Sequence, residues 1–494
     1  MEIEFLKTKN NLQTVKINSL LLHSLYNPEA EAERFTENLK LPFIPQNLII
    51  IEPGLEYCAK FLRKKFSETK LISVRLCDEL LKYTEKNSFD IEFSSENNFS
   101  DFKKFLNSLS DKEIFNTLFA VWTPSEKIFK TQISNLQTII KNFYEKSKTL
   151  LLTSEYFEKK WLLNSCKFVS NAKNIIQLNK IKKDILICAS GPSLKNVIPE
   201  IKNHRNKLFV LCLSSALSAL LNQKIFPDLV MSTDGGYWAG EHLKYLTKTD
   251  IPLALTTEAF CPSLLLSKQN ILPLCYEDGI SAKLLKDSNI PFLRAKRNGT
   301  VSGTALEFAI ENISDGKKIF FAGLDLSVCK NFQHTQPNEL EKNNCLKDNF
   351  LNTCEKRQIP QSFKNSSLDL YLSWFQNQNF SENKIFRIIE NCEKNNNLNK
   401  IKDISLNDFK NIMEKTDAVT ENYFYKINYE LNRSKLKEIH KNLINLIKQK
   451  EVIEQIFPIT CLSIEHNSEN LELKDKLKNE TDKIIKKAGK YFHE

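Results

Sequence analysis

The stretch Ile185-Leu-Ile-Cys-Ala-Ser-Gly-Pro-Ser-Leu194 decides the fold that we expect for this chain. It begins with a run of apolar residues, which is typical of a strand buried on both faces of a parallel sheet. A Ser-Gly turn follows, Pro192 fixes φ, and Ser193 stands where a helix N-cap would be. Turns of this kind aim backbone N–H groups and the positive end of a helix at one point, which is how α/β folds bind phosphate. A strand-turn-helix with one glycine is as often purely structural, so both interpretations stay open.

Further short apolar runs accompany this strand, separated by enough chain for a helix. They lie at residues 185–189, 208–213, 229–232, 253–256, 270–274 and 318–322. This alternation predicts βαβ units and a mainly parallel sheet. Nine of the 11 glycines fall between Gly191 and Gly323, so the tight turns gather in the same segment. We therefore expect a Rossmann-like domain, without the G-x-G-x-x-G fingerprint of dinucleotide sites and without the Gly-Lys-Ser/Thr of a P-loop.

The flanking sequence predicts two other kinds of domain. Residues 47–54 form a buried strand that enters a tight turn, which together with apolar runs at 71–76 and 118–122 predicts a smaller α/β domain. After about Asn338 the chain is polar and has no convincing strand. Apolar residues recur there at helical spacing, at Phe424, Ile427, Leu431, Leu436, Ile439, Leu443 and Leu446. These helices either pack on one another or offer a face to a protein partner.

The fold class expected is therefore α/β, with a Rossmann-like central domain, a smaller N-terminal α/β domain and a C-terminal helical domain. The predicted boundaries are 1–130 for the N-terminal domain, 131–182 for a helical connector, 183–337 for the central domain and 338–494 for the C-terminal domain.

Composition limits the class of protein. A chain with 41% hydrophobic and 26% charged residues is globular, and its net charge of +10 is spread without a basic stripe interleaved with aromatics, so nucleic acid is not an expected partner. The 12 cysteines form no C-x-x-C pair, which favours a reducing compartment. The N-terminus lacks the apolar core of a signal peptide, and no run of 18 apolar residues occurs, so we expect a cytoplasmic protein with no membrane partner.

Two aspartates follow predicted strands of the central domain. Asp234 stands before Gly235 after the run at 229–232, and Asp325 follows the run at 318–322. Because ligands of open α/β sheets bind at the carboxyl ends of the strands, we expect both carboxylates at one edge. Each aspartate could instead simply cap a turn.

Hydroxyl side chains precede the predicted helix 305–313, in Asn298-Gly-Thr-Val-Ser-Gly-Thr304. Thr300, Ser302 and Thr304 offer hydroxyls and free N–H groups at the start of that helix. A helix cap explains one of them, and three together indicate a second anion site.

The order of these motifs resembles a known family. The run Ala189–Leu194, then Pro227-Asp228 leading to Ser232-Thr-Asp-Gly-Gly236, then Asn298–Thr304 and Gly323-Leu-Asp-Leu-Ser327 are similar to the motility-associated factors (Maf), which are bacterial flagellin glycosyltransferases. The central domain of that family belongs with the archaeal hydroxymethylpterin diphosphokinases (MptE-like) and is similar in fold to the family 42 sialyltransferases. His23–Arg34 and Ile51–Tyr57 resemble the opening of the same family, so the resemblance covers about two thirds of the chain.

The resemblance implies an activity. A nonulosonic acid, pseudaminic or legionaminic, would pass from its CMP-activated donor to Ser or Thr of flagellin, in support of flagellar assembly and motility. Ser190, Gly191, Pro192 and Ser193 would hold the phosphate and ribose of CMP, although Ser190 stands where the sialyltransferases commonly have Asn.

The family position favours His334 as the base that accepts the acceptor hydroxyl proton, with Asp325 beside it and His242 in reserve. His334 could also be an idle loop residue. No Asp-x-Asp occurs, so we expect transfer without a metal and with no required cofactor, while the oligomeric state, including a homo-oligomer, stays open.

Other functions remain open at this stage. A pterin diphosphokinase-like enzyme would use ATP and magnesium, and Asp234 and Asp325 would suit the metal. A non-catalytic partner of flagellin would keep the α/β domain as a relic. A methyltransferase strand-loop at Ile51–Gly54 lacks that motif's further glycines.

Overall fold

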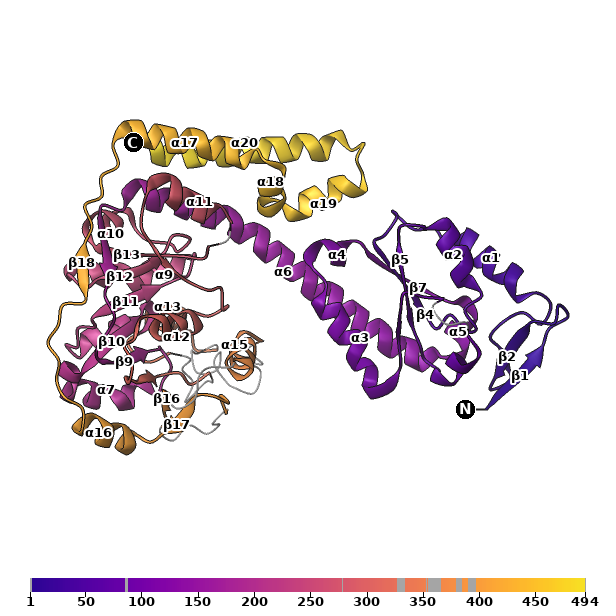
Figure 1. Cartoon of the computed structure of the whole chain (residues 1–494), viewed down its shortest axis with the longest axis horizontal. Helices are drawn as coiled ribbons and strands as arrows, with labels where there is room; N and C mark the ends of the chain where they lie inside the picture. The colour runs from indigo at the N-terminus through magenta and orange to yellow at the C-terminus, as the bar shows by residue number, and fades with distance from the viewer. Residues whose placement is uncertain are drawn as a thin grey trace. The chain divides into compact units, whose positions relative to one another are not determined.

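The structure is a computed structural model that describes residues 2–84, 88–277, 279–326, 334–351, 353, 366–378, 384–389 and 397–493. It divides into two compact units, Met1–Tyr156 with Phe457–Leu477, and Phe157–Ile456 with Lys478–Glu494. The long helix α6 (Lys130–Asn171) contributes to both units (Figure 1). The four-part division predicted from the sequence stays a prediction.

The first unit contains a small parallel sheet, with strand order β6-β5-β4-β7. Its apolar strands pack against helices, as the sequence predicts for this region. The strands of that sheet are β4 (Asn47–Ile51), β5 (Lys70–Val74), β6 (Ile91–Phe93) and β7 (Thr117–Val121). An antiparallel sheet precedes it, made of β1 (Ile3–Lys7), β2 (Gln13–Ile17) and β3 (Leu20–Leu21). The helices are α1 (Pro28–Asn38), α2 (Cys58–Lys65), α3 (Glu96–Ser108), α4 (Asp111–Phe115), α5 (Thr123–Ile128) and α19 (Pro458–His466).

The second unit is built on an 11-stranded sheet with the order β17-β16-β15-β9-β10-β11-β12-β13-β8-β18, and β14 pairs with β13. All pairs are parallel except β18 with β8. Six of its strands are those predicted from apolar runs: β9 (Asp184–Cys188), β10 (Leu208–Leu213), β11 (Leu229–Ser232), β12 (Leu253–Thr256), β13 (Asn270–Cys275) and β15 (Ile319–Ala322). The remaining strands are β8 (Asn174–Leu178), β14 (Leu293–Arg294), β16 (Ile385–Ile388), β17 (Lys402–Ile404) and β18 (Phe424–Lys426).

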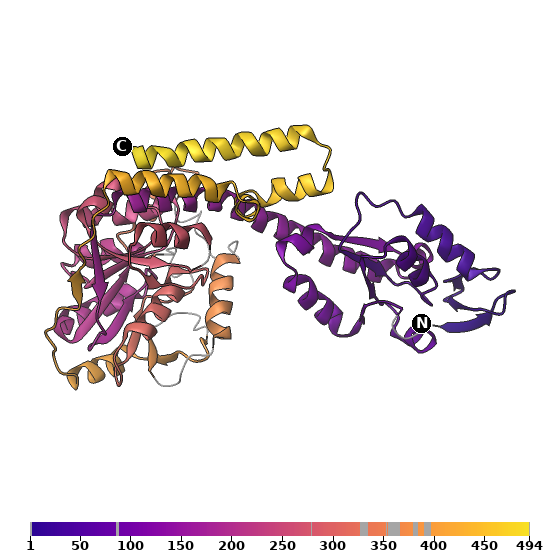
Figure 2. The same cartoon turned by 45° about the horizontal axis from the view of Figure 1, so that its top comes forward.

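Helices surround this sheet and fill the connections between its strands (Figure 2). They are α7 (Leu194–Asn203), α8 (Leu217–Asn222), α9 (Tyr237–Leu243), α10 (Ser263–Lys268), α11 (Gly279–Ser288), α12 (Val301–Asn312), α13 (Glu339–Cys345), α15 (Ser366–Asn377), α16 (Leu406–Glu414), α17 (Arg433–Ile447) and α18 (Lys450–Ile456). The mixed α/β fold class is thereby confirmed.

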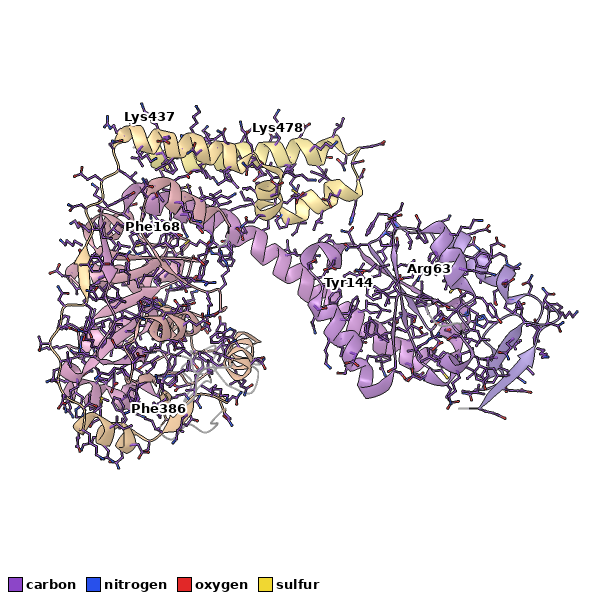
Figure 3. All side chains as sticks on the ribbon, in the orientation of Figure 1. Arg63, Tyr144, Phe168, Phe386, Lys437 and Lys478 are labelled. Atoms are coloured by element: carbon purple, nitrogen blue, oxygen red, sulfur yellow. The ribbon has the colours of Figure 1, made fainter. Side chains whose placement is uncertain are left out.

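The C-terminal region is helical, as expected. Helix α17 and the C-terminal part of α20 (Leu471–His493) lie side by side, and His440 stacks there on Phe492 with ring centroids 5.5 Å apart. The exposed Lys437 and Lys478 project outward from these two helices (Figure 3).

The expectation that no strand follows Asn338 is wrong. β16, β17 and β18 all join the large sheet, and Phe424 begins β18 rather than a helix. These strands are three or four residues long, too short to show an alternation in the sequence. They exist because the edges of an already formed sheet supply their hydrogen-bonding partners.

The chain changes direction within the sheet at β9. Strands β10 to β13 lie in sequence on one side of β9, and β15 lies on the other. The loops that follow β9 and β15 therefore diverge at the carboxyl edge, which is the topological switch point where open α/β sheets bind ligands. The predicted turn at Ser190–Ser193 lies at this point.

Two glycines allow the two loops to touch. The Gly191 N–H donates to the Gly323 carbonyl at 2.8 Å. Gly323 has φ +75°, and a Cβ added to it would lie 2.4 Å from the Ala189 carbonyl oxygen. Neither loop can move aside, because the strands β9 and β15 that lead into them are paired along their length.

The contact between the two loops predicts that alanine at Gly316 and at Gly323 lowers the free energy of unfolding by different amounts. Gly316 has φ +77° and open space around its Cβ position, so Gly316→Ala should lower the free energy of unfolding by only about 1–2 kcal/mol, the usual strain of left-handed backbone. Gly323→Ala carries the same strain plus a clash worth roughly 1–3 kcal/mol. Chemical denaturation of both variants measures the difference, and equal costs would contradict the tight loop crossing.

Candidate functional site

Ser193 and Asp325 meet at the switch point. The Ser193 N–H donates to Asp325 Oδ2 at 2.8 Å, and the Ser193 hydroxyl donates to Asp325 Oδ1. A Cβ on Gly191 would lie 2.6 Å from Asp325 Oδ2, so the glycine is required for this approach. The structure thus brings together residues that are 132 positions apart in the sequence.

This pairing corrects one expectation about the turn. The backbone N–H of Ser193 was expected to be free for a phosphate, but it is bonded to the Asp325 carboxylate. The Gly191 N–H is likewise bonded, to Gly323. An anionic ligand at this turn must therefore compete with Asp325 for the Ser193 donors, or bind through neighbouring groups such as the Ser190 hydroxyl. The roles predicted for Ser190, Gly191, Pro192 and Ser193 stay predictions.

Burial raises the pKa of Asp325, while the Ser193 hydrogen bonds and the charge of Arg387 act in the opposite direction. Arg387 lies on β16 with only 2% of its surface exposed. It donates to the Leu324 carbonyl at 3.3 Å and to both carboxylate oxygens of Asp403 at 2.7 and 2.8 Å. The sequence analysis missed Arg387, whose only signal was a lone arginine inside an apolar run.

Asp234 and two histidines form a second part of the edge. Asp234 is exposed after β11, and its Oδ1 accepts the Gly236 N–H at 2.9 Å, which is the turn-capping contact considered as an alternative role. The pKa of His242 on α9 is lowered by burial and by the charge of His334, and Asp234 opposes that shift.

His334 is held next to the β9 turn. The Thr335 N–H donates to the Ser190 carbonyl at 2.7 Å, so the two predicted segments are directly linked. The His334 N–H donates to Glu341 Oε1 at 2.9 Å, and the ring Nδ1 lies 3.4 Å from the same oxygen. Glu341 is a buried residue that the sequence analysis missed, because it lies in a segment that was expected to be only a helix.

The start of α12 is only partly available as an anion site. Thr300 is the N-cap residue but makes no side-chain capping bond, and Ser302 is buried. The Thr304 hydroxyl donates to the Lys296 carbonyl at 3.1 Å. Asn298 Nδ2 is buried without a hydrogen-bond partner among the residues that the structure describes, which adds a donor to this group. The second anion site stays a prediction.

A stacked arginine lies beside Gly235. Arg297 donates to both carboxylate oxygens of the buried Glu258, at 2.7 and 2.8 Å. Its guanidinium lies 4.9 Å from the ring centroid of Trp161 and 4.4 Å from that of Tyr276. A Cβ on Gly235 would lie 2.9 Å from the Trp161 ring, so this glycine admits the stack. Nothing in the sequence pattern pointed to this cluster, because its members follow four different strands or lie on α6.

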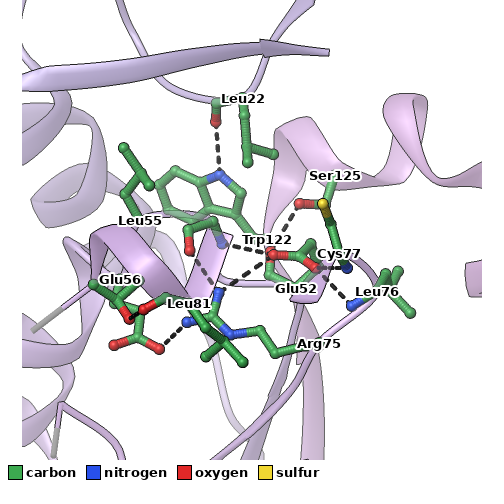
Figure 4. Close-up of polar contacts among 12 residues, drawn as sticks. Leu22, Glu52, Leu55, Glu56, Arg75, Leu76, Cys77, Leu81, Trp122 and Ser125 are labelled. Atoms are coloured by element: carbon green, nitrogen blue, oxygen red, sulfur yellow. Dashed lines mark hydrogen bonds and ion pairs between the residues drawn. The ribbon is translucent and has the colours of Figure 1, made fainter. Parts of the chain in front are cut away.

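The corresponding edge of the N-terminal sheet is closed by its own side chains (Figure 4). Glu52 is fully buried after β4, and its carboxylate accepts the N–H groups of Leu76 and Cys77 at 2.6 and 2.9 Å. Arg75, also fully buried, pairs with Glu52 at 3.4 Å and with Glu56. The strand-loop at Ile51–Gly54 thus uses its carboxylate to hold the fold of this unit.

Among the residues that the structure describes, no group of three or more His, Cys, Asp or Glu side chains is arranged to hold a metal ion. No helix among the described segments has the length and apolar character needed to cross a membrane.

Comparison with known proteins identifies the central domain. Residues 159–331 match the family described as 6-hydroxymethylpterin diphosphokinase MptE-like, which confirms the MptE-like central domain expected from the motifs. This segment includes α7, α9 and α12 and the strands from β8 to β15, so it contains the switch point and most of the predicted site.

Similar proteins occur in Treponema pallidum (strain Nichols). One uncharacterized protein is 31% identical over 271 residues, covering 55% of this chain and 59% of that protein. A second is 23% identical over 206 residues, covering 41% of this chain and 36% of that protein. The chain thus spans less than two thirds of the length of each of these relatives. A solved structure, of a MAf glycosyltransferase from Magnetospirillum magneticum AMB-1, aligns with a TM-score of 0.47 and 9% identity over 100% of this chain and 90% of that one.

The partly buried Asp325 predicts a pH dependence of stability. Because its pKa is raised, the folded protein holds the proton more tightly than the unfolded chain does. The stability that Asp325 contributes is therefore full below the ordinary pKa of 3.8 and is lost as the pH rises through the folded pKa. Relative to Asp325→Asn, the wild-type protein should lose free energy of unfolding as the pH is raised from about 4 to 7 in denaturation experiments.

Asp408 supplies a control of opposite sign. Hydrogen bonds from Ser405 lower its pKa, so its contribution is present above the ordinary value and is lost as the pH falls. Relative to Asp408→Asn, the wild-type protein should therefore gain free energy of unfolding as the pH is raised. A pH-independent difference for Asp325→Asn would contradict the assignment.

Proposed function

We propose that this protein is a glycosyltransferase of the motility-associated factor type. It would move a nonulosonic acid, pseudaminic or legionaminic, from a CMP-activated donor to Ser or Thr of flagellin. The observation that carries the proposal is the convergence of the family-like motifs on one edge of an MptE-like domain, with the Ser193–Asp325 contact at its centre. The proposal includes the cytoplasm as location and flagellin as partner, with no nucleic acid or membrane involved.

The chemistry of such a transfer fits the groups at this edge. The bond between the sugar anomeric carbon and the CMP phosphate oxygen breaks through an oxocarbenium-like state, and the acceptor hydroxyl oxygen forms the new bond. The acceptor proton passes to His334, and the electron pair of the broken bond leaves with CMP. The starts of α7 and α12 would face the departing phosphate, because helices that follow parallel strands begin at the carboxyl edge.

Asp325 has a separate part in this proposal. Its carboxylate accepts from the Ser193 N–H and hydroxyl, which are the donors that an anion at the turn would also use. Donor binding would shift these donors from the carboxylate to the phosphate, and Arg387 stays close enough to stabilise the released Asp325. Neither step requires a metal ion or a further cofactor.

The family match also supports a second candidate. Proteins described as 6-hydroxymethylpterin diphosphokinase MptE-like share the central domain, and a diphosphate transfer would use ATP with magnesium at Asp234 and Asp325. A non-catalytic flagellin-binding protein is the third candidate. Nucleotide binding separates all three.

A thermal-shift screen tests the donor. A CMP-sugar at 100 times its Kd should stabilise the folded protein by about 2.7 kcal/mol, seen as a rise in Tm, and CMP should bind where UDP and GDP do not. A larger rise with ATP and magnesium than with any CMP compound would favour the diphosphokinase. Tight flagellin binding with no response to any nucleotide would favour the non-catalytic protein.

A transfer assay tests the acceptor and the base. Flagellin incubated with the protein and a CMP-activated nonulosonic acid should gain the mass of the sugar. His334→Gln should lower kcat by roughly 10²–10⁴, because the acceptor hydroxyl then lacks a base. His204→Gln is the matched control, since His204 pairs with Glu200 at 3.3 Å on α7. If flagellin keeps its mass with every donor tried, the proposal is wrong.

A further inference from the structure

Glu341 is a buried carboxylate that touches the proposed base. It lies on α13 with 2% of its surface exposed, and its Oε1 contacts both the backbone N–H and the ring Nδ1 of His334. Burying a carboxylate is costly unless hydrogen bonds or a charged partner offset the loss of water. For the Glu341 carboxylate, His334 supplies both: a hydrogen bond from its backbone N–H and a ring that can carry charge.

Helix α13, which carries Glu341, is held in place by the contacts of two residues at its start. Asn338 at its start donates from Nδ2 to the Ser215 carbonyl at 3.2 Å and accepts the Leu340 N–H at 3.0 Å. Glu339 pairs with Lys244 at 2.8 Å and accepts the Tyr245 hydroxyl. These contacts tie α13 to the segments that follow β10 and β11, so Glu341 is presented to His334 from a fixed position.

The ring contact selects one protonation form of the imidazole. A neutral histidine carries its proton on one nitrogen, and a carboxylate beside Nδ1 favours the form with the proton on Nδ1. Nε2 is then left as the acceptor, which is the nitrogen that a general base needs. The two atoms lie 3.4 Å apart, and Nδ1 has no hydrogen-bond partner among the described residues, so the carboxylate acts on the ring through its charge.

We infer that Glu341 is a positioning residue, which holds the His334 imidazole with Nδ1 protonated and Nε2 free to take the acceptor proton. The inference rests on the proposed transferase function. The Thr335–Ser190 backbone bond fixes the same segment against the β9 turn, at the edge of the sheet where the donor would bind.

A purely structural role makes different predictions. If Glu341 only ties the loop at His334 through the backbone N–H, its replacement should lower the Tm and leave the tautomer and kcat of the folded enzyme unchanged. A positioning role requires that the tautomer and kcat change together, with KM little affected.

The test uses the full-length chain labelled with ¹⁵N-histidine. Long-range ¹H–¹⁵N NMR, assigned with His334→Gln, reports the tautomer of His334, and the transfer assay reports kcat and KM. In Glu341→Gln the amide keeps the shape but loses the charge, so we expect a mixture of tautomers and a fall in kcat of at least about 10-fold. Glu341→Asp should restore the Nδ1-protonated form in part and recover part of kcat.

Glu200→Gln is the matched control, because it removes the carboxylate of the His204 pair on α7. It should alter neither the His334 tautomer nor kcat. An unchanged tautomer or an unchanged kcat in Glu341→Gln would overturn the inference. If the wild-type protein transfers no sugar while Glu341→Gln still shifts the tautomer, the proposed function fails and the contact between Glu341 and the imidazole is upheld.

Discussion

The structure of the central unit depends on the crossing of two loops at the carboxyl edge of its sheet. The Gly191–Gly323 backbone bond and the Ser193–Asp325 pair join the loops after β9 and β15. β9 and β15 are neighbours in the sheet. The chain continues from β9 to β10 on one side and from β15 to β16 on the other, so the two loops begin side by side and run in opposite directions. Only residues without a Cβ permit the approach, because a methyl group at either glycine would overlap the opposite loop.

Charged side chains gather at the edge of the sheet, and they have polar or charged partners without all being buried. Asp325 has Ser193 and Arg387, Glu258 has Arg297, and Glu341 has His334. Each pair lies at a strand end or on a helix beside it, and Asp234 and His334 keep some exposure. In the N-terminal unit, by contrast, Glu52 and Arg75 are fully buried and paired with each other, and Arg75 also pairs with Glu56. The same kind of strand-end carboxylate thus stabilises a fold in one unit and stays near solvent in the other.

Chain beyond the family-matched segment completes the candidate site. Residues 159–331 include the β9 turn, Asp234 and Asp325, but His334, Glu341 and Arg387 all come later. Arg387 reaches the site because β16 pairs with β15, and Glu341 because α13 is anchored by Asn338 and Glu339. The later polar sequence is therefore part of the central unit's structure rather than a separate attachment.

The sequence alone determined six strands of the central sheet, β9 to β13 and β15, since each is a continuous apolar run bounded by glycine, proline or a polar turn. It also placed Ser193, Asp234 and Asp325 at one edge, because parallel strands end on the same side. It did not find β8, which lies within the segment 131–182 predicted as a helical connector. It also missed β14 and β16 to β18, whose two to four residues form strands only against an existing sheet. The pairing of Ser193 with Asp325, and of His334 with Glu341, was decided by the tertiary structure, because burial and distance between remote segments exist only after the chain has folded.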